Sequence, residues 1–370
     1  MKVLMTADPV GGVWTFALEL CERLAADGVA VTLATLGAPL TAAQRSAAAR
    51  LPGIALEESA FRLEWMPDPW ADLERAGRWL LRLEREHRPD VIHLNHLAHG
   101  DLSWRAPVLV SGHSCVTSWW HAVHGSAPPA TWDTYKLRVR RSLQAADCVV
   151  APTRAMLSEL RRHYGPLPRA AAVPNGRDPA RFPPGRHKEH LVLCAGRLWD
   201  AAKNAQALAT VAPLLDWPVC IAGEVVSPDG SRADIAATNL HVLGTLSPPE
   251  LATWYARAAI YALPARYEPF GLTPLEAALS GCALLLGDIP SLREVWGDAA
   301  CYVPPDDQDC LRGRLEELIW NGAARMELAA RAAEVAARLS PESTARGYLR
   351  LYRKLASRPA GSDMTHAARA

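Results

Sequence analysis

Long apolar runs are missing from this sequence, and so is an excess of charge of one sign. The longest apolar candidate, residues 277–287, is interrupted by Ser280 and Gly281 and is shorter than the roughly 18 residues that cross a bilayer. The N-terminal apolar stretch is too short for a signal peptide, and no small-residue cleavage pattern follows it. The 40 Lys and Arg residues are balanced by 39 Asp and Glu residues, which indicates neither a nucleic-acid partner nor an acidic tail. We therefore expect a cytoplasmic protein, with peripheral contact to the inner membrane face still open.

The sequence also lacks two common motifs, a C-x-x-C cysteine pair and a glycine-rich dinucleotide fingerprint. None of the eight cysteines forms a C-x-x-C pair, and several, such as Cys148 and Cys194, lie inside apolar runs. Scattered cysteines of this kind are usually small buried hydrophobic residues rather than disulfide or zinc ligands. Residues 7–14, ADPVGGVW, do not form G-x-G-x-x-G, so a dinucleotide fingerprint is not supported.

The chain does contain enough apolar material for two domains, since 49% of its 370 residues are hydrophobic. Short apolar runs, such as residues 2–6, alternate with segments of helical period, such as residues 153–164. This alternation indicates parallel sheets covered on both faces. It stops at residues 173–190, where four prolines and two glycines indicate a linker, and then resumes.

We therefore predict an α/β protein with two facing doubly wound, Rossmann-like domains. The N-terminal domain takes residues 1–184 and the C-terminal domain residues 185–340. Residues 311–339 are expected to form a long helical region. A last helix at about 341–357 is expected to pack back on the first domain, and residues 358–370 to form a flexible tail. Ligands of such sheets bind beyond the carboxyl ends of the strands, and a cleft between domains is a favoured place.

The most informative stretch is ARYEPFGLTPLEAALSG, residues 265–281. Thr273 can cap a helix whose third residue is Glu276, which is the pattern of a capping box. Gly271, just before it, lets the backbone approach a ligand, and free amides at a helix start bind anions such as a diphosphate. Glu268 and Glu276 can then accept hydrogen bonds from ligand hydroxyls. The alternatives are that Glu276 only caps the helix and that Glu268 is an exposed loop carboxylate.

Two further turns follow predicted strands. Arg197 and Lys203 lie in AGRLWDAAKN, where two cations at a strand end could neutralise a departing phosphate; the alternative is a pair of surface cations. Gly11 and Gly12 follow the first strand and could bring backbone amides to a ligand, or they could form a plain tight turn.

The upstream Arg197 and Lys203, together with E-x7-E at Glu268 and Glu276, resemble the retaining glycosyltransferases of family 4, which have the GT-B fold. The Gly-Gly turn, the NG loop at Asn175 and the LG at Leu243 also match. The resemblance covers about residues 1–350. Two residues depart from the family pattern, because Trp199 and Asp200 stand where small or polar residues are usual.

The resemblance implies that a nucleotide-diphosphate sugar binds the second domain, an acceptor binds the first, and no bound metal or other cofactor is needed. Arg197 and Lys203 would hold the diphosphate, and Glu268 would touch the transferred sugar. His113 would lie near that sugar. Thr273 would meet phosphate and Glu276 the ribose hydroxyls, and the remaining donor contacts would come from Gly11, Gly12, Gly196, Leu243, Gly244, Phe270, Gly271 and Leu272.

Other features allow two interpretations each. His93, His96 and His99, three apart, could bind a metal, or they could lie in a strand-end loop where Asn95 and His96 touch an acceptor. Trp119 and Trp120 could belong to an acceptor-side loop or to a small hydrophobic cluster, and Asp8 is placed on the acceptor side. A set of cations on two first-domain helices could meet anionic lipid or simply be solvated: Lys136, Arg138, Arg140, Arg141, Arg154, Arg161 and Arg162.

The predicted function is transfer of a hexose-type sugar from a nucleotide-diphosphate sugar to the hydroxyl of a glycan, glycolipid or small molecule. Three alternatives remain open: a non-hydrolysing sugar-nucleotide epimerase, a nucleotide-sugar-binding module without transfer activity, and a glycoside hydrolase that uses Glu268 and Glu276 as its carboxylate pair. The sugar, the nucleobase and the acceptor are not identified by the sequence.

Overall fold

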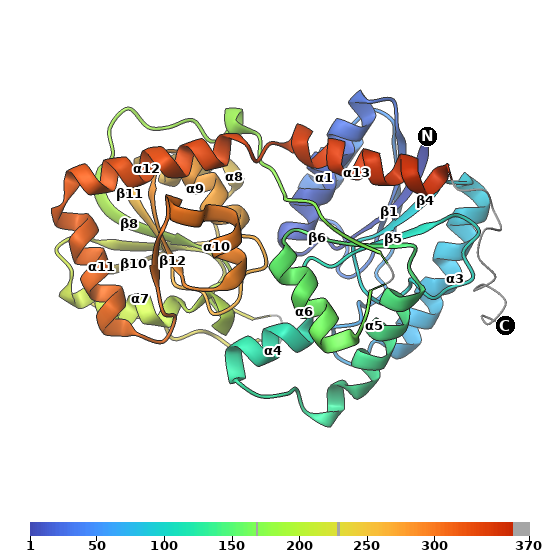
Figure 1. Cartoon of the computed structure of the whole chain (residues 1–370), viewed down its shortest axis with the longest axis horizontal. Helices are drawn as coiled ribbons and strands as arrows, with labels where there is room; N and C mark the ends of the chain where they lie inside the picture. The colour runs from blue at the N-terminus through green and yellow to red at the C-terminus, as the bar shows by residue number, and fades with distance from the viewer. Residues whose placement is uncertain (168, 228–229, 358–370) are drawn as a thin grey trace. The chain divides into compact units, whose positions relative to one another are not determined.

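The chain forms two compact units (Figure 1). The computed structural model describes residues 1–167, 169–227 and 230–357, so the tail predicted at residues 358–370 lies outside the described residues. The first unit contains Met1–Ser118, Ala127–Pro174 and the segment that begins at Pro341. The second unit contains Trp119–Ser126 and Asn175–Ser340.

The second unit takes in residues 175–184, which the sequence analysis placed in the first domain. These residues belong to the second unit because they contact it directly. The backbone amide of Arg177 donates to the carbonyl of Leu339 at 3.0 Å.

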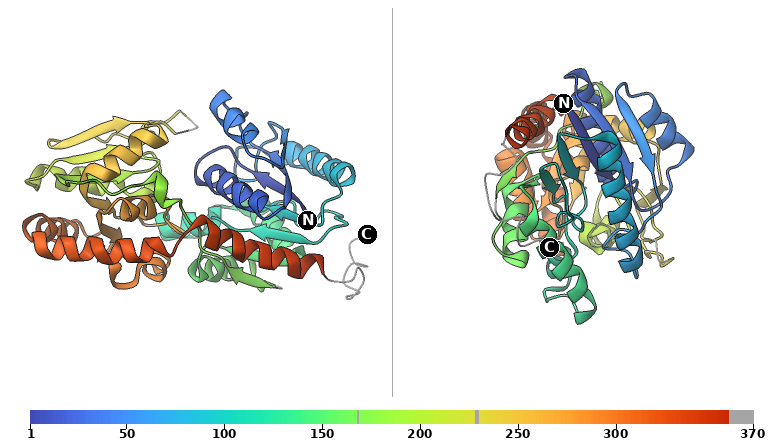
Figure 2. Two further views of the ribbon diagram at one scale, coloured as in Figure 1. Left: turned by 90° about the horizontal axis from the view of Figure 1, so that it is seen from above. Right: turned by 90° about the vertical axis from the view of Figure 1, so that its right-hand side faces the viewer.

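The first unit is built on a parallel sheet with the strand order β3-β2-β1-β4-β5-β6-β7. Figure 2 shows helices on both of its faces. Its elements are β1 (Lys2–Ala7), α1 (Gly12–Ala26), β2 (Ala30–Thr35), α2 (Ala42–Ala49), β3 (Ile54–Glu58), α3 (Trp70–His87), β4 (Val91–Leu94), β5 (Val108–Ser111), α5 (Asp133–Ala145), β6 (Cys148–Ala151), α6 (Arg154–Tyr164), β7 (Ala170–Ala172) and α13 (Pro341–Ala356). Helix α4 (Val116–His124) begins in this unit, and its residues from Trp119 belong to the second.

Helices α1 and α13 pack against each other in the first unit (Figure 1). Each buries residues that recur every three or four positions, which is the period of an amphipathic helix. In α13 these are Thr344, Ala345, Tyr348, Leu349, Tyr352 and Leu355. The helix is also tied to the sheet, because the Tyr352 hydroxyl lies 2.7 Å from His93 Nδ1 and the Tyr348 hydroxyl lies 3.1 Å from Ser111 Oγ.

The second unit repeats the plan with a parallel sheet in the order β10-β9-β8-β11-β12-β13. Its elements are β8 (Glu189–Ala195), α7 (Ala205–Val211), β9 (Val219–Ala222), β10 (Leu240–Gly244), α8 (Pro248–Arg257), β11 (Ala258–Leu263), α9 (Leu272–Leu279), β12 (Ala283–Gly287), α10 (Pro290–Trp296), β13 (Cys301–Val303), α11 (Gln308–Trp320) and α12 (Gly322–Ala337). No described helix of either unit has both the length and the apolar character to cross a membrane.

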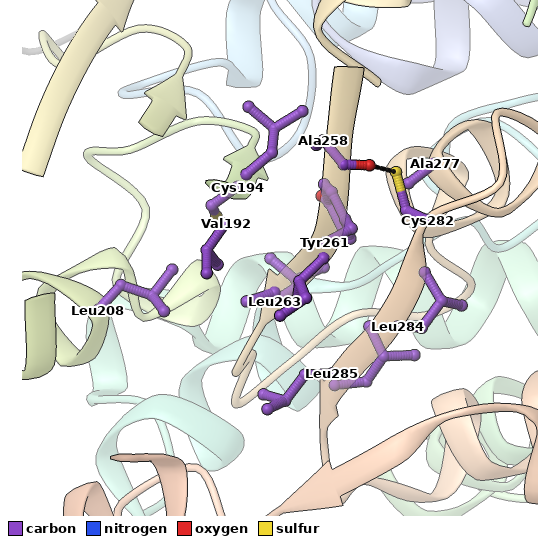
Figure 3. Packing of buried hydrophobic residues seen from close by; sticks show 14 of the residues in the cluster. Val192, Cys194, Leu208, Ala258, Tyr261, Leu263, Ala277, Cys282, Leu284 and Leu285 are labelled. Carbon is purple, nitrogen blue, oxygen red and sulfur yellow. Dashed lines mark hydrogen bonds between the residues drawn. The ribbon is translucent and has the colours of Figure 1, made fainter. Parts of the chain in front are cut away.

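The core of the second unit forms where β8, β11 and β12 meet the covering helices (Figure 3). Every residue of β11 and of β12 is buried, as expected for central strands covered on both faces. Cys282 is a buried core residue, and its thiol donates to the carbonyl of Ala258 at 3.2 Å. Six of the eight cysteines are buried and two are half-buried.

The helical region predicted for residues 311–339 consists of two helices. Helix α11 ends at Trp320, and Asn321 caps α12 by accepting a hydrogen bond from the amide of Ala324. An Asn at the N-cap satisfies an amide that would otherwise lack an acceptor. The helical period continues on both sides of the break, so periodicity alone did not reveal it.

A glycine at the end of β9 sets how closely the strand ends of the second unit approach each other. Gly223 has a φ of +143°, and a Cβ on it would lie 1.7 Å from the carbonyl oxygen of Gly196. Its amide donates to the carbonyl of Gly244 at 2.8 Å. Three strand-end backbones therefore lie against one another only because position 223 has no side chain.

Replacing Gly223 with alanine should lower the free energy of unfolding by about 2 to 4 kcal/mol, because the backbone of Gly196 must move. Gly313→Ala is the matched control, since Gly313 is an exposed position of α11 where a Cβ meets nothing within 4 Å. That variant should gain about 0.5 to 1 kcal/mol. Urea denaturation of both variants measures the difference, and equal stabilities would contradict this account.

Candidate functional site

The carboxyl ends of the strands of the second unit bring the two predicted motifs to one edge. Gly196 and Arg197 directly follow β8, and the loop with Glu268 follows β11, which pairs in parallel with β8. Gly244 ends β10 and bonds to Gly223 at the same edge. Parallel pairing therefore collects at one sheet edge residues that are up to about 80 positions apart in sequence.

Lys203 and Glu268 form an ion pair across this edge. The Lys203 Nζ lies 2.6 Å from Glu268 Oε2, and the two side chains are only 15% and 14% exposed. The amide of Phe270 donates to Glu268 Oε1 at 3.4 Å, and the Ser291 hydroxyl donates to the Glu268 carbonyl. Glu268 is thus a fixed, paired carboxylate rather than an exposed loop group.

Arg197 has its own carboxylate partner, Asp200, which is one of the two departures from the family pattern. The Arg197 Nη2 lies 3.0 Å from Asp200 Oδ2. Asp200 is buried, and its Oδ1 accepts from the Ala202 amide at 3.0 Å and from the Trp119 indole at 2.9 Å. The Arg197 side chain is 46% exposed and lies over the Trp199 ring. Arg197 can therefore turn toward a ligand while Asp200 stays in place.

The predicted capping box at Thr273 and Glu276 is wrong. Helix α9 begins earlier, at Leu272, and its N-cap is Gly271 in the left-handed conformation with a φ of +91°. Thr273 and Pro274 are therefore inside the first turn, where proline is tolerated. The amides of this first turn have no acceptor within the helix, so the start of α9 keeps the anion-binding character expected from the sequence.

Thr273 instead contacts a tyrosine that the sequence analysis did not single out. The hydroxyl of Tyr261, on β11, lies 2.7 Å from Thr273 Oγ1 and 3.1 Å from the carbonyl oxygen of Ala195. Tyr261 is fully buried and links the start of α9 to the residue before Gly196. Nothing in the apolar strand sequence distinguished this tyrosine from a core residue.

Glu276 is paired with Arg177, which the sequence analysis also did not single out. The Arg177 Nε lies 2.8 Å from Glu276 Oε1, and the side chains are 7% and 9% exposed. Three cations and three carboxylates thus stand in pairs at this site. An anion that binds here would contact cations that are oriented by carboxylates, and it would also contact the free amides at the start of α9. This combination of groups suits a diphosphate.

In the first unit, the residues around Asn95 form a buried chain of hydrogen bonds. The Asn95 amide donates to Thr6 Oγ1, which lies 2.9 Å from His96 Nδ1. His96 Nε2 lies 2.6 Å from His99 Nδ1, and His99 Nε2 donates to the Leu73 carbonyl. Because that carbonyl only accepts, the neutral tautomers are fixed along the whole chain.

This network also orients His113. The Asn95 side-chain amide donates to the Thr6 carbonyl, so Asn95 Oδ1 faces His113 and accepts from its Nε2 at 2.8 Å. His113 is thereby left with Nδ1 as an acceptor. Burial lowers the pKa of His113 to about 4, which keeps its imidazole neutral near pH 7. The Phe16 and His113 rings pack in an edge-to-face arrangement, with 4.6 Å between their centroids.

The three histidines of HLNHLAH are not arranged to bind a metal. Burial lowers the pKa of His93 to about 3 and that of His96 well below its usual range. His93 bonds to Ser111 and Tyr352, whereas His96 and His99 bond to each other. Within the described part of the chain, no group of three or more His, Cys, Asp or Glu side chains is placed to hold a metal ion.

The tryptophan pair lies on a helix, not in the predicted loop. Trp119 and Trp120 belong to α4 and pack with His124, whose ring centroid lies 4.4 Å from that of Trp120. In the β1–α1 turn, the Val10 amide donates to Asp8 Oδ1 at 2.8 Å, and Gly11 is the N-cap of α1 with a φ of +78°.

The basic residues of α5 and α6 are partly neutralised. Lys136 pairs with Asp133, Arg138 with Glu74, Arg141 with Asp101 and Arg162 with Glu159. This pairing lowers the charge that such a surface would offer to anionic lipid.

Two family models match this chain. The model of Glycosyltransferase Family 4 matches residues 10–181, and the model of Glycosyl transferases group 1 matches residues 189–321. The lipopolysaccharide core biosynthesis mannosyltransferase LpcC of Rhizobium leguminosarum is 32% identical over 141 residues, which are 35% of this chain and 39% of that protein. The D-inositol 3-phosphate glycosyltransferase of Streptomyces bingchenggensis is 27% identical over 341 residues, covering 76% and 70%.

Solved structures agree on the fold. Sucrose-phosphate synthase from Thermosynechococcus elongatus has a TM-score of 0.81 at 19% identity, covering 96% of this chain and 99% of that one. Anabaena HepE in complex with UDP-glucose has a TM-score of 0.72 at 15% identity, covering 96% and 100%. This chain therefore belongs to the family 4, group 1 glycosyltransferases, has the GT-B fold and is an enzyme of the hexosyltransferase type.

Proposed function

We propose that the protein moves a hexose from a nucleotide-diphosphate sugar to an acceptor hydroxyl and retains the anomeric configuration. One observation carries this proposal. Two cations and the open first turn of α9 meet at one edge of the second sheet, and both cations are already oriented by carboxylates. Such preorganised charge is suited to a diphosphate that gains charge as it leaves.

The second unit takes the donor in this proposal. Arg197 and Lys203 hold the diphosphate, with Gly196 and the amides of α9 beside them. Glu268, fixed by Lys203, accepts hydrogen bonds from the transferred sugar. The remaining donor contacts are ribose hydroxyls at Glu276, phosphate at Thr273, and backbone contacts at Phe270, Gly271, Leu272, Leu243 and Gly244.

The first unit supplies His113 and the acceptor side. Neutral His113 presents Nδ1 to the hydroxyls of the transferred sugar, and Gly11 and Gly12 bring backbone to the donor. The buried positions of Asn95 and His96 favour a role in holding His113 rather than in touching an acceptor. Asp8, Trp119 and Trp120 remain the proposed acceptor contacts.

In the reaction step, the bond between the anomeric carbon and the phosphate oxygen breaks, and a bond to the acceptor oxygen forms on the same face. The acceptor proton passes to the leaving diphosphate oxygen. Arg197 and Lys203 stabilise the charge on that oxygen, so the site requires no resident metal and no enzyme nucleophile.

The relatives support the donor class. Anabaena HepE has been solved with UDP and with UDP-glucose, and other relatives are named as a mannosyltransferase and as inositol-phosphate glycosyltransferases. The hydrolase alternative is disfavoured by the geometry. Glu268 and Glu276 belong to separate ion pairs instead of flanking one bond as a hydrolase pair must.

Replacing Arg197 with alanine should lower kcat by about 100-fold or more, the usual cost of losing one group that stabilises developing charge. Arg257→Ala is the matched control. Arg257 also pairs with a carboxylate, Glu189, and stacks on a tryptophan, Trp254, but it lies where β8 and β11 begin, at the opposite sheet edge. Steady-state kinetics on nucleotide sugars measure both, and a loss of only a few-fold for Arg197→Ala would refute the role of this cation.

A nucleoside diphosphate should raise the melting temperature of the second unit by roughly 5 to 10 °C at 100 times its Kd, since a ligand bound only to the native state adds about 2.7 kcal/mol and a unit of this size gains roughly 2 to 4 °C per kcal/mol. UDP, GDP and ADP are compared with the matching nucleosides, which lack the diphosphate. If no nucleotide shifts the transition, the proposed donor site is wrong.

Retention is tested by NMR of the product formed from an α-linked nucleotide sugar. An α-linked product at early time points is expected, because donor and acceptor use the same face of the sugar. A β-linked product would reject retention while leaving glycosyl transfer intact.

A further inference from the structure

A cavity of about 400 Å³, the α3-end cavity, lies at the amino ends of two strands of the first unit. It is formed by the end of α3 and by the segments that precede β4 and β5, and its charged lining residues are Glu84, Arg85, Arg88, Asp90 and Arg105. Asn95 and His113 follow the carboxyl ends of the same two strands. Each strand has four residues and is therefore about 13 Å long, so the cavity is separate from the His113 edge.

Three of the lining residues are arginines that converge from two parts of the chain. Arg85 and Arg88 lie at the end of α3, and Arg105 lies just before β5. All three are exposed, and none of their guanidinium groups forms a hydrogen bond or an ion pair with another described residue. The helix dipole favours cations at the end of α3, but it does not account for Arg105. Like charges that line one cavity repel each other, and an anion bound among them would remove that repulsion.

Glu84 fixes the backbone positions from which two of these arginines extend. Its carbonyl accepts the Arg88 amide at 2.9 Å, and its buried Oε1 accepts the Arg105 amide at 2.8 Å. The other carboxylate, Asp90, accepts the Lys2 amide through Oδ2 at 2.7 Å. Both carboxylates are thus bonded to backbone amides. Three cations against two carboxylates leave the cavity with a net positive charge.

Arg88 has a backbone conformation that favours glycine. It is the C-cap of α3, with a φ of +48° in the left-handed region. A residue with a Cβ is destabilised in this region, whereas glycine is not. Asn204 and Asn239 also have a positive φ, but asparagine tolerates this conformation better than arginine does. Arg88 therefore costs stability where it stands, and strained residues of this kind gather at ligand-binding sites.

A phosphate monoester matches the groups that line the cavity. Guanidinium groups bind phosphate oxygens through paired, charge-assisted hydrogen bonds, and a monoester has a charge of about −1.5 to −2 near neutral pH. Asp90 Oδ1 accepts no hydrogen bond from another described residue, so it can accept one from a ligand hydroxyl. The volume of about 400 Å³ lies in the range of small-molecule pockets, roughly 300 to 1,000 Å³.

We propose that the α3-end cavity is a second ligand site of this protein and that Arg85, Arg88 and Arg105 bind the phosphate group of a phosphate monoester there. The site goes beyond the proposed function, because it uses none of the residues assigned to the donor or to the acceptor. The phosphate group can belong to a soluble polyol or sugar phosphate, or to the headgroup of phosphatidic acid. Both sources present the same group to the arginines.

Binding of glycerol 3-phosphate to the full chain is measured by calorimetry, with glycerol as the ligand that lacks the phosphate. Arg85→Gln and Arg105→Gln should each weaken this binding roughly tenfold or more, because each removes charge-assisted hydrogen bonds. Arg78→Gln is the matched control. Arg78 is an exposed residue of the same helix, has no ion pair with another described residue and does not line the cavity, so its Kd should equal that of the wild type.

Arg88→Gly distinguishes ligand binding from a purely structural role of this arginine. Glycine removes the strain of the left-handed conformation, so the melting temperature of the first unit should rise by roughly 1 to 3 °C. Binding of glycerol 3-phosphate should nevertheless weaken roughly tenfold or more. A purely structural role would give the opposite pair of results, a lower melting temperature and an unchanged Kd.

The lipid source is tested with phosphatidylcholine vesicles that contain or lack phosphatidic acid. If only the vesicles with phosphatidic acid bind, and the three arginine variants release them, the site stands with a lipid headgroup as its ligand. If only glycerol 3-phosphate binds in this way, the site stands with a soluble ligand.

The proposal is overturned if neither glycerol 3-phosphate nor the vesicles with phosphatidic acid bind to the wild type. It is also overturned if they bind and the variants of Arg85, Arg88 and Arg105 keep the wild-type affinity. Loss of binding in Arg197→Ala instead of in these variants would place the phosphate at the proposed donor site and would refute the α3-end site.

Discussion

Pairing of each cation with a carboxylate is the interaction on which the carboxyl-end edge of the second sheet depends. Arg197, Lys203 and Arg177 lie at the end of an apolar sheet, where unpaired charges would be costly. Asp200, Glu268 and Glu276 neutralise them and also fix their directions. The three pairs differ in burial, so the most exposed cation is free to reorient, whereas the most buried pair is rigid. Burial therefore increases from Arg197, which is proposed to bind the phosphates, to Glu276, which is proposed to bind the ribose.

In the first unit, the polar groups at the strand ends are satisfied by neutral hydrogen bonds instead of ion pairs. Its polar residues at the strand ends, from Thr6 through Asn95 to His99, are neutral and satisfy one another in an ordered chain. Burial depresses the pKa of these histidines, so the chain does not change charge near neutral pH. His113 is fixed at its end. One sheet edge thus offers oriented neutral groups and the other offers balanced charges, which agrees with the proposed acceptor side on the first unit and the proposed diphosphate site on the second.

The sequence predicted some parts of the site better than others. Strand runs such as residues 260–263 were recognisable because both faces of the sheet are covered, and the Arg, Lys and Glu residues were recognisable by their resemblance to the family pattern. The start of α9 was misplaced, because Gly271 takes a left-handed conformation that begins the helix before Thr273. Helix α4 was taken for a loop because its apolar positions include two adjacent tryptophans. Arg177 and Tyr261 gave no signal, since their partners are about 100 and 12 residues away.

What the sequence determined by itself is the alternation of apolar strands and amphipathic helices, and with it the parallel sheets, because the periodicity of buried residues is a local property of the chain. It also determined which residue types stand after each strand. Only the tertiary structure decided how these side chains pair. A lysine and a glutamate 65 positions apart, or a tyrosine and the helix start it supports, meet only when two strands align, and hydrogen-bond geometry is then set by backbone positions that the sequence does not encode locally.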